Sequence, residues 1–227
     1  MQKPLTWVFD LDNTLHDARP HIFPHLSRSM TAYLREHLVL DETEASALRV
    51  HYWRTYGATL LGLMRHHGTD PRHFLLETHQ FPDLARMVIA EGGLKQALRR
   101  LRGRKILFSN APQHYVRAVL DILRIAELFD AHYSVEDMRY QPKPLLGGFR
   151  LMLARERIAP ERSVLVEDSL ANLRAARRLG MKTVWVTREA RSPAWLDAKV
   201  ASVLALPRIA PSLGQPRPSK PAVGGNR

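Results

Sequence analysis

Apolar residues along the chain fall into short runs separated by longer amphipathic segments. Four runs are rich in β-forming residues and stop abruptly at polar residues, as buried parallel strands do: residues 5–9, 105–108, 163–166 and 182–186. Helical spacing of apolar residues marks residues 93–101, 113–123 and 170–179, and Gly180 is suited to end the last of these helices. The alternation predicts an α/β fold with a Rossmann-like, doubly wound parallel sheet.

Residues 19–92 interrupt this alternation, because they predict several helices in succession and no convincing strand. We therefore expect an inserted all-helical cap on a Rossmann-like core formed by residues 1–18 and 93–205. Residues 206–227 are rich in proline and glycine and carry four basic and no acidic side chains. This composition predicts a flexible basic tail.

The residue types also limit the compartment and the chemistry. The chain contains no cysteine, which excludes disulfides, thiolate metal ligands and cysteine nucleophiles. No segment approaches the run of roughly 18 apolar residues that a membrane-spanning helix needs. Two aspartates lie within the first twelve residues, which leaves no room there for the apolar stretch of a signal peptide. We therefore expect a cytoplasmic protein with no membrane partner.

The net charge of +12 raises the question of a nucleic-acid partner. Much of the basic excess lies in stretches with helical periodicity, such as residues 99–105 and 174–178, where solvated helix faces account for it. These runs contain no interleaved aromatic residues that would stack on bases. A dedicated nucleic-acid site is therefore not expected, although a basic surface would attract small anionic substrates.

Polar residues follow three of the predicted strands at the point where each strand ends. They are Asp10 and Asp12, then Ser109 and Asn110, and then Glu167 and Asp168. Because the carboxyl ends of parallel strands meet at one edge of a sheet, these side chains are expected to converge on one crevice. Taken singly, each has an ordinary explanation as a turn or helix cap, and Lys143 alone is typical of a solvated loop lysine.

Taken together, the segments WVFDLDNTL, LFSNAP, PKP and VLVEDS occur in order, each with a suitable strand or helix context. They resemble the four motifs of the haloacid dehalogenase superfamily, over roughly residues 5–187. A carboxylate such as Asp10 can attack phosphorus and form an aspartyl phosphate. Asp12 points to the same side of an extended segment and can serve as acid and then base. Haloalkanoate dehalogenases lack this second aspartate, so its presence favours phosphate chemistry.

A cation is expected at the predicted site, because two carboxylates that face a phosphate would repel it. Oxygen ligands suit Mg²⁺. The resemblance implies that the ligands are the side chain of Asp10, the backbone carbonyl of Asp12 and the side chain of Asp168. Glu167 would support the metal through a water molecule or through contacts with its ligands.

Three further residues are candidates for binding the phosphoryl group. Ser109 can donate a hydrogen bond to a phosphoryl oxygen, assisted by the backbone N–H of Asn110, and Lys143 can offset negative charge on the nucleophile and the transferring group. Thr14 is expected to be a structural support. The relatives suggest that the bond between Lys143 and Pro144 is cis.

Substrate choice in such proteins is expected to depend on the cap. The segments HYWRTYGATLLGL and SNAPQHYVRAVLDIL resemble the pyrimidine 5′-nucleotidase branch, which implies UMP, CMP or a related nucleoside monophosphate as substrate. Candidate substrate-binding residues in the cap are His51, Tyr56, Thr59 and Arg65. The alternative is that Trp53, Tyr56, Leu60 and Leu63 form a helix stripe that packs the interior of the cap.

Other functions stay open on the sequence alone. The runner-up is a phosphatase for another small metabolite, such as phosphoglycolate or a sugar phosphate. A phosphomutase would share the aspartyl phosphate and the helical cap, with a sugar hydroxyl in place of water as the acceptor. A non-catalytic RNA-binding scaffold is disfavoured, because it has no chemical need for the complete set of Asp10, Asp12, Ser109, Lys143 and Asp168.

Overall fold

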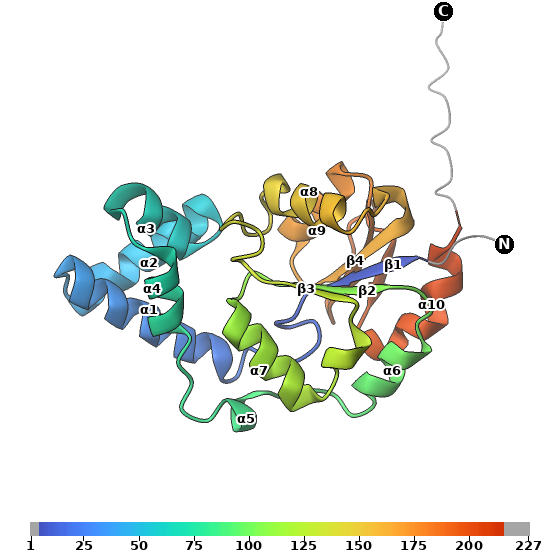
Figure 1. Ribbon diagram of the computed structural model, residues 1–227, viewed down its shortest axis with the longest axis horizontal. Coiled ribbons are helices and arrows are strands. Elements are labelled where there is room, and N and C mark those ends of the chain that lie inside the picture. The colour runs from blue at the N-terminus through green and yellow to red at the C-terminus, as the bar shows by residue number, and fades with distance from the viewer. Residues whose placement is uncertain (1–4, 216–227) are drawn as a thin grey trace, which may run out of the picture.

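A six-stranded parallel sheet lies at the centre of the larger part of the molecule (Figure 1), in a computed structural model that describes residues 5–215. Across the sheet the strands are β3 (Ala131–Tyr133), β2 (Lys105–Phe108), β1 (Thr6–Phe9), β4 (Ser163–Glu167), β5 (Lys182–Val186) and β6 (Ala198–Val200). All neighbouring strands pair in parallel. The predicted Rossmann-like α/β fold is confirmed, and its strand order is that of a doubly wound sheet.

The two edge strands, β3 and β6, were not among the strands predicted from the sequence. Each has three residues, AHY in β3 and AKV in β6. A segment this short carries too few positions to establish a hydrophobic period. Its strand conformation comes from pairing with β2 or β5, which only the tertiary structure provides.

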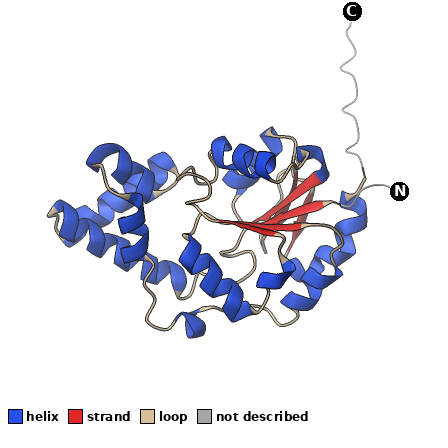
Figure 2. Cartoon of the chain, viewed as in Figure 1, coloured by secondary structure: helices blue, strands red, loops and turns tan. Residues whose placement is uncertain are grey.

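Helices cover both faces of the sheet (Figure 2). One face packs against α6 (Leu94–Arg100), α7 (Gln113–Leu123) and α10 (Leu206–Leu213), and the other against α8 (Leu146–Arg155) and α9 (Leu170–Arg178). Within β1, Trp7 and Phe9 belong to the first of these clusters and Val8 to the second. Successive strand residues point to opposite faces, so an unbroken apolar run fills both layers and fixes β1 at the centre.

Five helices lie between β1 and α6. They are α1 (Ile22–Leu38), α2 (Glu42–Tyr56), α3 (Thr59–His67), α4 (Pro71–Thr78) and α5 (Leu84–Met87). Helices α1 to α4 form the helical part on the left of Figure 1. A capping box of Asp41 and Glu44 begins α2, and Gly57, at φ +83°, ends it. Gly62 is required in α3 because a Cβ there would lie 2.2 Å from Cγ of Tyr52.

The two chain segments that join the helical part to the core lie side by side. Asp17 and Ile89 form an antiparallel bridge, in which the Asp17 N–H donates to the Ile89 carbonyl at 2.7 Å. The helical part therefore has two adjacent connections at the carboxyl edge of the sheet. Rotation of the helical part about these connections is a prediction from this geometry.

The prediction of a flexible tail from residue 206 onward is wrong for its first part. Residues 206–213 form helix α10, in which Leu206 and Leu213 are buried against the core. The ammonium of Lys182 also donates to the Leu213 carbonyl. Proline at the first helical turn is compatible with a helix, and the apolar residues recur at helical spacing. The rest of the predicted tail, from residue 216, lies outside the described residues.

Three short 3-10 helices complete the architecture of the described residues: Ala126–Leu128, Pro160–Arg162 and Val203–Ala205. Across residues 5–215, no helix combines the length and the apolar character needed to cross a bilayer.

Candidate active site

The residues predicted from the strand ends meet at the carboxyl edge of the sheet. Asp10 follows β1, Ser109 follows β2, and Glu167 and Asp168 lie at the end of β4. One carboxylate oxygen from each of Asp10, Glu167 and Asp168 lies within 4.8 Å of the other two. The fold therefore gathers three acidic side chains, from segments more than 150 residues apart, around one point.

Lys143 is the cation inside this acidic cluster. Its Nζ atom lies 2.6 Å from Oδ1 of Asp10 and 2.8 Å from Oε2 of Glu167, and its side chain is only 1% exposed. Burial works to lower the pKa of Lys143, but the charges of Asp10 and Glu167 outweigh it and hold that pKa above its usual value. Lys143 is therefore an ammonium that donates to both carboxylates, and the solvated-loop alternative is excluded.

The loop that carries Lys143 is fixed at both of its backbone polar groups. The Lys143 N–H donates to Oδ1 of Asn110 at 2.7 Å, and Nδ2 of Asn110 donates to the Lys143 carbonyl at 2.9 Å. The bond between Lys143 and Pro144 is cis, as the resemblance suggested. The Asn110 side chain is thus occupied with this loop, so only its backbone N–H remains for the predicted phosphate contact.

Burial raises the pKa values of the three clustered carboxyl groups. For Asp10, burial and then the charge of Glu167 outweigh Lys143 and raise the pKa to about 7. Burial also raises the pKa of Glu167 and of Asp168, and for Asp168 the charge of Asp10 adds to the effect. When several neighbouring carboxyl groups have raised pKa values, a cation bound between them stabilises their ionised forms.

The donor set of the cluster fits a hard divalent cation. It contains only carboxylate oxygens, and Lys143 supplies one positive charge against three acidic groups. Asp168 is held in place by Nδ2 of Asn13, which donates to its Oδ2 at 3.2 Å, and by Nε1 of Trp185, which donates to its backbone carbonyl at 2.8 Å. Such contacts orient a metal ligand before the metal binds.

Two smaller hydroxyl groups complete this part of the site. Thr14 donates from Oγ1 to Oδ2 of Asp10 at 3.3 Å, which agrees with its predicted supporting role. Ser109 is 1% exposed, and its Oγ accepts from the backbone N–H of Ala111 at 3.1 Å. Among the described residues no acceptor takes the Ser109 hydroxyl proton, which leaves that proton available to a bound oxygen.

Asp12 lies outside the three-carboxylate cluster and has partners that the sequence did not predict. Its Oδ1 accepts a hydrogen bond from the Tyr115 hydroxyl at 2.7 Å and lies 2.9 Å from Nε2 of His16. The spacing of four residues between Asp12 and His16 is the sequence feature that could have indicated their contact. Tyr115 lies in the first turn of α7. Because it is 103 residues from Asp12 in the chain, no local sequence pattern could predict this contact.

The four candidate residues of the cap have different surroundings. The Tyr56 hydroxyl lies 2.6 Å from Nε2 of His66, and the Arg65 guanidinium lies 5.8 Å from the centre of the Tyr56 ring. His51 is exposed on the surface of α2, where it lines a shallow depression together with Glu42. Thr59 is buried and donates to the Arg49 carbonyl at 3.1 Å. We therefore remove Thr59 from the substrate-binding set, because its hydroxyl proton is already used.

The end of α2 lies close to the loop that carries Lys143. A Cβ on Gly57 would be 3.4 Å from Cδ of Pro144, so the turn after Tyr56 lies close to the residue that follows Lys143. The alternative interpretation of the α2–α3 stripe holds for Leu60 and Leu63, which are buried, and in part for Tyr56, which is half-buried and packs against the same cluster. It does not hold for Trp53, which is 58% exposed.

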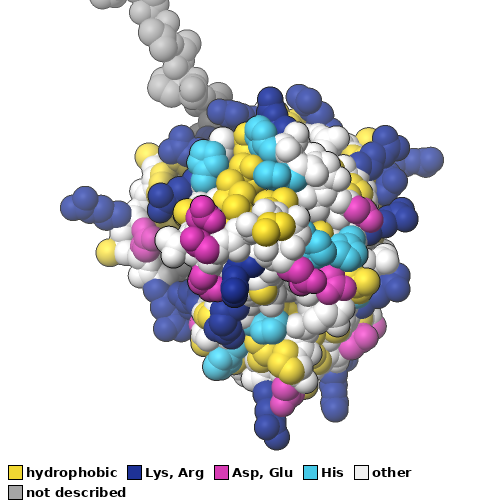
Figure 3. Space-filling model, turned by 90° about the vertical axis from the view of Figure 1, so that its left-hand side faces the viewer, with side chains coloured by type: hydrophobic (Ala, Val, Ile, Leu, Met, Phe, Trp, Pro, Cys, Tyr) yellow, Lys and Arg dark blue, Asp and Glu magenta, His cyan; other side chains and the backbone are white. Residues whose placement is uncertain are grey.

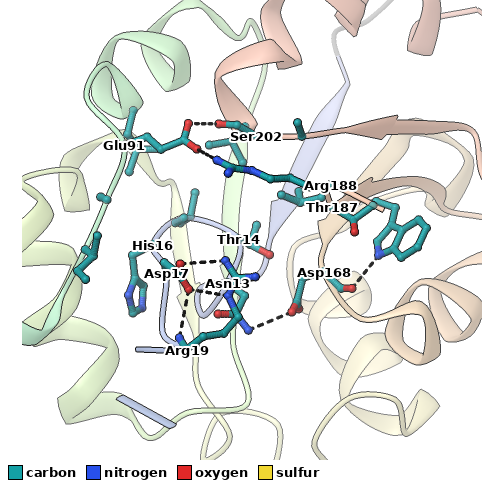
Figure 4. A pocket seen from close by; sticks show the side chains of 18 of the residues that line it. Asn13, Thr14, His16, Asp17, Arg19, Glu91, Asp168, Thr187, Arg188 and Ser202 are labelled. Carbon is teal, nitrogen blue, oxygen red and sulfur yellow. Dashed lines mark hydrogen bonds and ion pairs between the residues drawn. The ribbon is translucent and has the colours of Figure 1, made fainter. Parts of the chain in front are cut away.

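A pocket of about 400 Å³ lies beside the cluster, between the two connecting segments and the ends of β4, β5 and β6. Figure 4 shows Asn13 and Asp168 on one wall. On the opposite side Glu91 accepts from the Ser202 hydroxyl at 2.5 Å and lies 3.6 Å from the Arg188 guanidinium. The pocket reaches Asp168 from the side of the connecting segments.

Basic side chains do not form one continuous patch on the face presented by the helical part (Figure 3). On that face Lys and Arg side chains lie mostly around the margin, with acidic and histidine side chains between them. This distribution differs from the continuous basic track expected for binding a nucleic-acid backbone.

Comparisons with known proteins agree with the fold. A family model described as haloacid dehalogenase-like hydrolase matches residues 6–180. The chain is 25% identical over 194 residues to phosphate metabolism protein 8 of Saccharomyces cerevisiae, a match that covers 77% of this chain and 59% of the yeast protein. It is 24% identical over 214 residues to phosphoglycolate phosphatase of Pseudomonas putida, which covers 88% of this chain and 76% of that relative.

Solved structures with the same fold cover nearly the whole chain. The crystal structure of a HAD phosphatase from Thermococcus onnurineus aligns with a TM-score of 0.63 at 20% identity, over 90% of this chain and 97% of that one. The L-2-haloacid dehalogenase from Xanthobacter autotrophicus, with chloropropionic acid covalently bound, aligns with a TM-score of 0.60 at 17% identity, over 92% and 99%. At these identities the likeness concerns the fold alone.

Proposed function

The chain belongs to the haloacid dehalogenase-like hydrolases, and on that premise we propose that it hydrolyses a phosphate monoester through an aspartyl phosphate on Asp10. The observation that carries the proposal is the buried ammonium of Lys143 between Asp10 and Glu167. It holds the Asp10 carboxylate in one orientation and supplies positive charge where a phosphoryl group would arrive.

In the first step, a carboxylate oxygen of Asp10 attacks phosphorus and the bond between phosphorus and the ester oxygen breaks. Asp12 gives its proton to the departing alkoxide, which leaves as an alcohol. Ser109 donates a hydrogen bond to a phosphoryl oxygen, assisted by the backbone N–H of Asn110. Lys143 offsets the charge that builds up between Asp10 and the phosphoryl group.

In the second step, Asp12, now a carboxylate, removes a proton from water as the water oxygen attacks phosphorus. The bond between phosphorus and Asp10 breaks, inorganic phosphate leaves, and both aspartates return to their starting states. A phosphomutase would use the same first step and a sugar hydroxyl in place of water in the second.

Asp10 and Asp168 are the side chains proposed to hold Mg²⁺, together with the backbone carbonyl of Asp12, and Glu167 supports them through its contacts. When bound, Mg²⁺ supplies Lewis-acid polarisation of a phosphoryl oxygen and neutralises the clustered carboxylates. The raised pKa values of Asp10, Glu167 and Asp168 support a cation at this place.

The substrates that we propose are pyrimidine nucleoside 5′-monophosphates, UMP and CMP. Tyr56, with Arg65 over its ring, lies one residue before Gly57, which lies close to Pro144, the residue after Lys143. An aromatic ring at that position is suited to stack on a base while the phosphate lies at Asp10. His51 and Arg65 remain candidates for polar contacts with the nucleotide.

Phosphoglycolate is the second candidate substrate. One relative carries that activity in its name, and its match covers 88% of this chain. A sugar phosphate would be bound by the same phosphoryl site with a different cap contact.

Phosphate release from a panel of esters, with Mg²⁺ present, tests the proposal. The panel contains UMP, CMP, AMP, phosphoglycolate and a sugar phosphate. We expect UMP and CMP to give the highest kcat/KM. Hydrolysis of AMP or phosphoglycolate at the same or a higher kcat/KM would reject the nucleotidase proposal, and no release from any ester would reject the phosphatase. Phosphorus NMR of the products distinguishes free phosphate from phosphoryl transfer to a sugar.

A further inference from the structure

Asp12 accepts both of its described hydrogen bonds on a single oxygen. The Tyr115 hydroxyl donates to Oδ1 at 2.7 Å, and Nε2 of His16 lies 2.9 Å from the same atom. No described residue donates to Oδ2. When Asp12 is protonated with both donors in place, its proton is therefore directed to Oδ2, because Oδ1 already faces two donors.

We propose that Tyr115 is a positioning residue that keeps Oδ2 of Asp12 as the proton-donating oxygen during departure of the alcohol. The inference rests on the proposed phosphatase function and deepens it, since it assigns the general acid a fixed orientation. Without such a constraint, rotation about the Cβ–Cγ bond would exchange the two oxygens and direct the proton away from the ester oxygen.

Both donors are held rigidly by their surroundings. The Tyr115 residue is 1% exposed, and its ring centre lies 5.2 Å from that of Phe81 and 6.1 Å from that of His79. The His16 side chain is fully buried, and its Nδ1 has no hydrogen-bond partner among the described residues. Burying the unpaired Nδ1 of His16 costs free energy of folding. The contact between Nε2 of His16 and Asp12 offsets part of that cost.

The same contacts connect the general acid to the segment that leads out of the helical part. His79 ends α4 and Phe81 follows it, whereas Tyr115 belongs to α7 of the core. The packing of these two rings against Tyr115 fixes the direction from which its hydroxyl approaches Asp12. The orientation of the acid therefore depends on side chains from both parts of the molecule.

The test compares two esters that differ in how much they need an acid. Phenyl phosphate and 4-nitrophenyl phosphate share the same ring, but 4-nitrophenolate leaves far more readily without a proton. In each case kcat/KM reports the step in which the ester bond breaks, and not the later hydrolysis of the aspartyl phosphate. The measured quantity is the ratio of the two kcat/KM values for each protein.

In Tyr115→Phe, which keeps the ring packing, we expect kcat/KM for phenyl phosphate to fall by ~10-fold or more. For 4-nitrophenyl phosphate it should fall by less than ~3-fold, since its departure depends little on the acid. His16→Leu removes the other donor and should change the ratio in the same direction. Partial misfolding would lower both values equally and leave the ratio unchanged, so the ratio separates positioning from stability.

Tyr133→Phe is the matched control, because the Tyr133 hydroxyl also donates to a carboxylate, Oε1 of Glu156, at 2.8 Å. That hydroxyl contact joins β3 to the residue after α8 and involves no side chain of the proposed site, so the control should keep the wild-type ratio. An equal loss on both esters in Tyr115→Phe, or no loss on either, overturns the positioning role while the phosphatase stands. If the wild-type protein cleaves neither ester, the failure belongs to the proposed function itself.

Discussion

The ammonium of Lys143 lies 2.6 Å from Oδ1 of Asp10, and the two residues are 133 positions apart in the chain. A second contact of 2.8 Å joins the same ammonium to Glu167. Three segments of the core, from the ends of β1 and β4 and from the loop before α8, are thereby held together by one buried cation. This arrangement links the stability of the fold to the proposed chemistry.

Replacement of Lys143 by Met should destabilise the protein. The variant leaves the buried carboxylates of Asp10 and Glu167 without their cation, and breaking a buried pair on one side costs about 3–5 kcal/mol. Urea unfolding measures the change in the free energy of unfolding. The control is Lys95→Met, which breaks a solvent-accessible pair with Glu127 and should change the free energy of unfolding far less, because water screens that pair. Equal stability of the Lys143→Met variant and the wild type would contradict the buried-pair interpretation.

Replacement of Asp10 by Asn should abolish metal-dependent phosphate release and yet stabilise the metal-free protein at pH 8. The folded-state pKa of Asp10, about 7, lies above the ordinary value of 3.8, so ionisation of this group costs stability as the pH rises through that range. An uncharged Asn avoids this cost, and the Lys143 ammonium keeps Glu167 as its anionic partner, so no buried charge is left unpaired. Phosphate release and thermal unfolding at pH 8 measure the two effects.

The exposed Asp121 provides the control for that substitution. Asp121→Asn should change neither phosphate release nor the melting temperature beyond ordinary surface effects. Undiminished turnover in Asp10→Asn would refute the nucleophile.

Mg²⁺ should raise the melting temperature of the wild-type protein, because it neutralises carboxylates that resist ionisation together. A ligand present at 100 times its Kd adds about 2.7 kcal/mol to the free energy of unfolding. Asp168→Asn should remove most of this increase, since it takes away one proposed ligand. Differential scanning calorimetry with and without chelator measures the effect, and an equal shift in wild type and variant would place the metal elsewhere.

His79 should make the protein less stable in mild acid. Burial, with the charge of His114 second, lowers the pKa of His79 from 6.5 to about 4. Between these values the unfolded chain binds a proton that the folded protein excludes, so stability is complete above pH 6.5 and is lost as the pH falls toward 4. The contribution at full extent is roughly 3 kcal/mol. Between pH 7.5 and 4.5, the free energy of unfolding measured with urea should fall more steeply in the wild type than in His79→Gln. Parallel curves for the two proteins would contradict this prediction.

Local patterns in the sequence predicted the parts of the structure that local interactions decide. The apolar run that ends at Phe9 is long enough to predict a buried strand, and Asp10 follows it directly. The position of Asp10 at the carboxyl edge of a parallel sheet follows from that pattern alone. The short strand β3 could not be predicted from the sequence, because three residues become a strand only when β2 is present to pair with them.

Helix α10 shows how composition can mislead. Its two prolines suggested an open tail, but Leu206 and Leu213 find buried positions against the core. Whether an apolar residue in a proline-rich segment becomes buried depends on a surface that other parts of the chain build. Residue composition contains no information about that surface.

The sequence by itself determined the fold class and the identity of the residues at the strand ends, including Asp10, Ser109 and Asp168. Only the tertiary structure decided which of them touch: that Lys143 bridges Asp10 and Glu167, and that Tyr115 donates to Asp12. The physical reason is range. Strand and helix formation depend on neighbours within a few positions, whereas the orientation of a catalytic carboxylate depends on side chains brought to it by packing across more than a hundred residues.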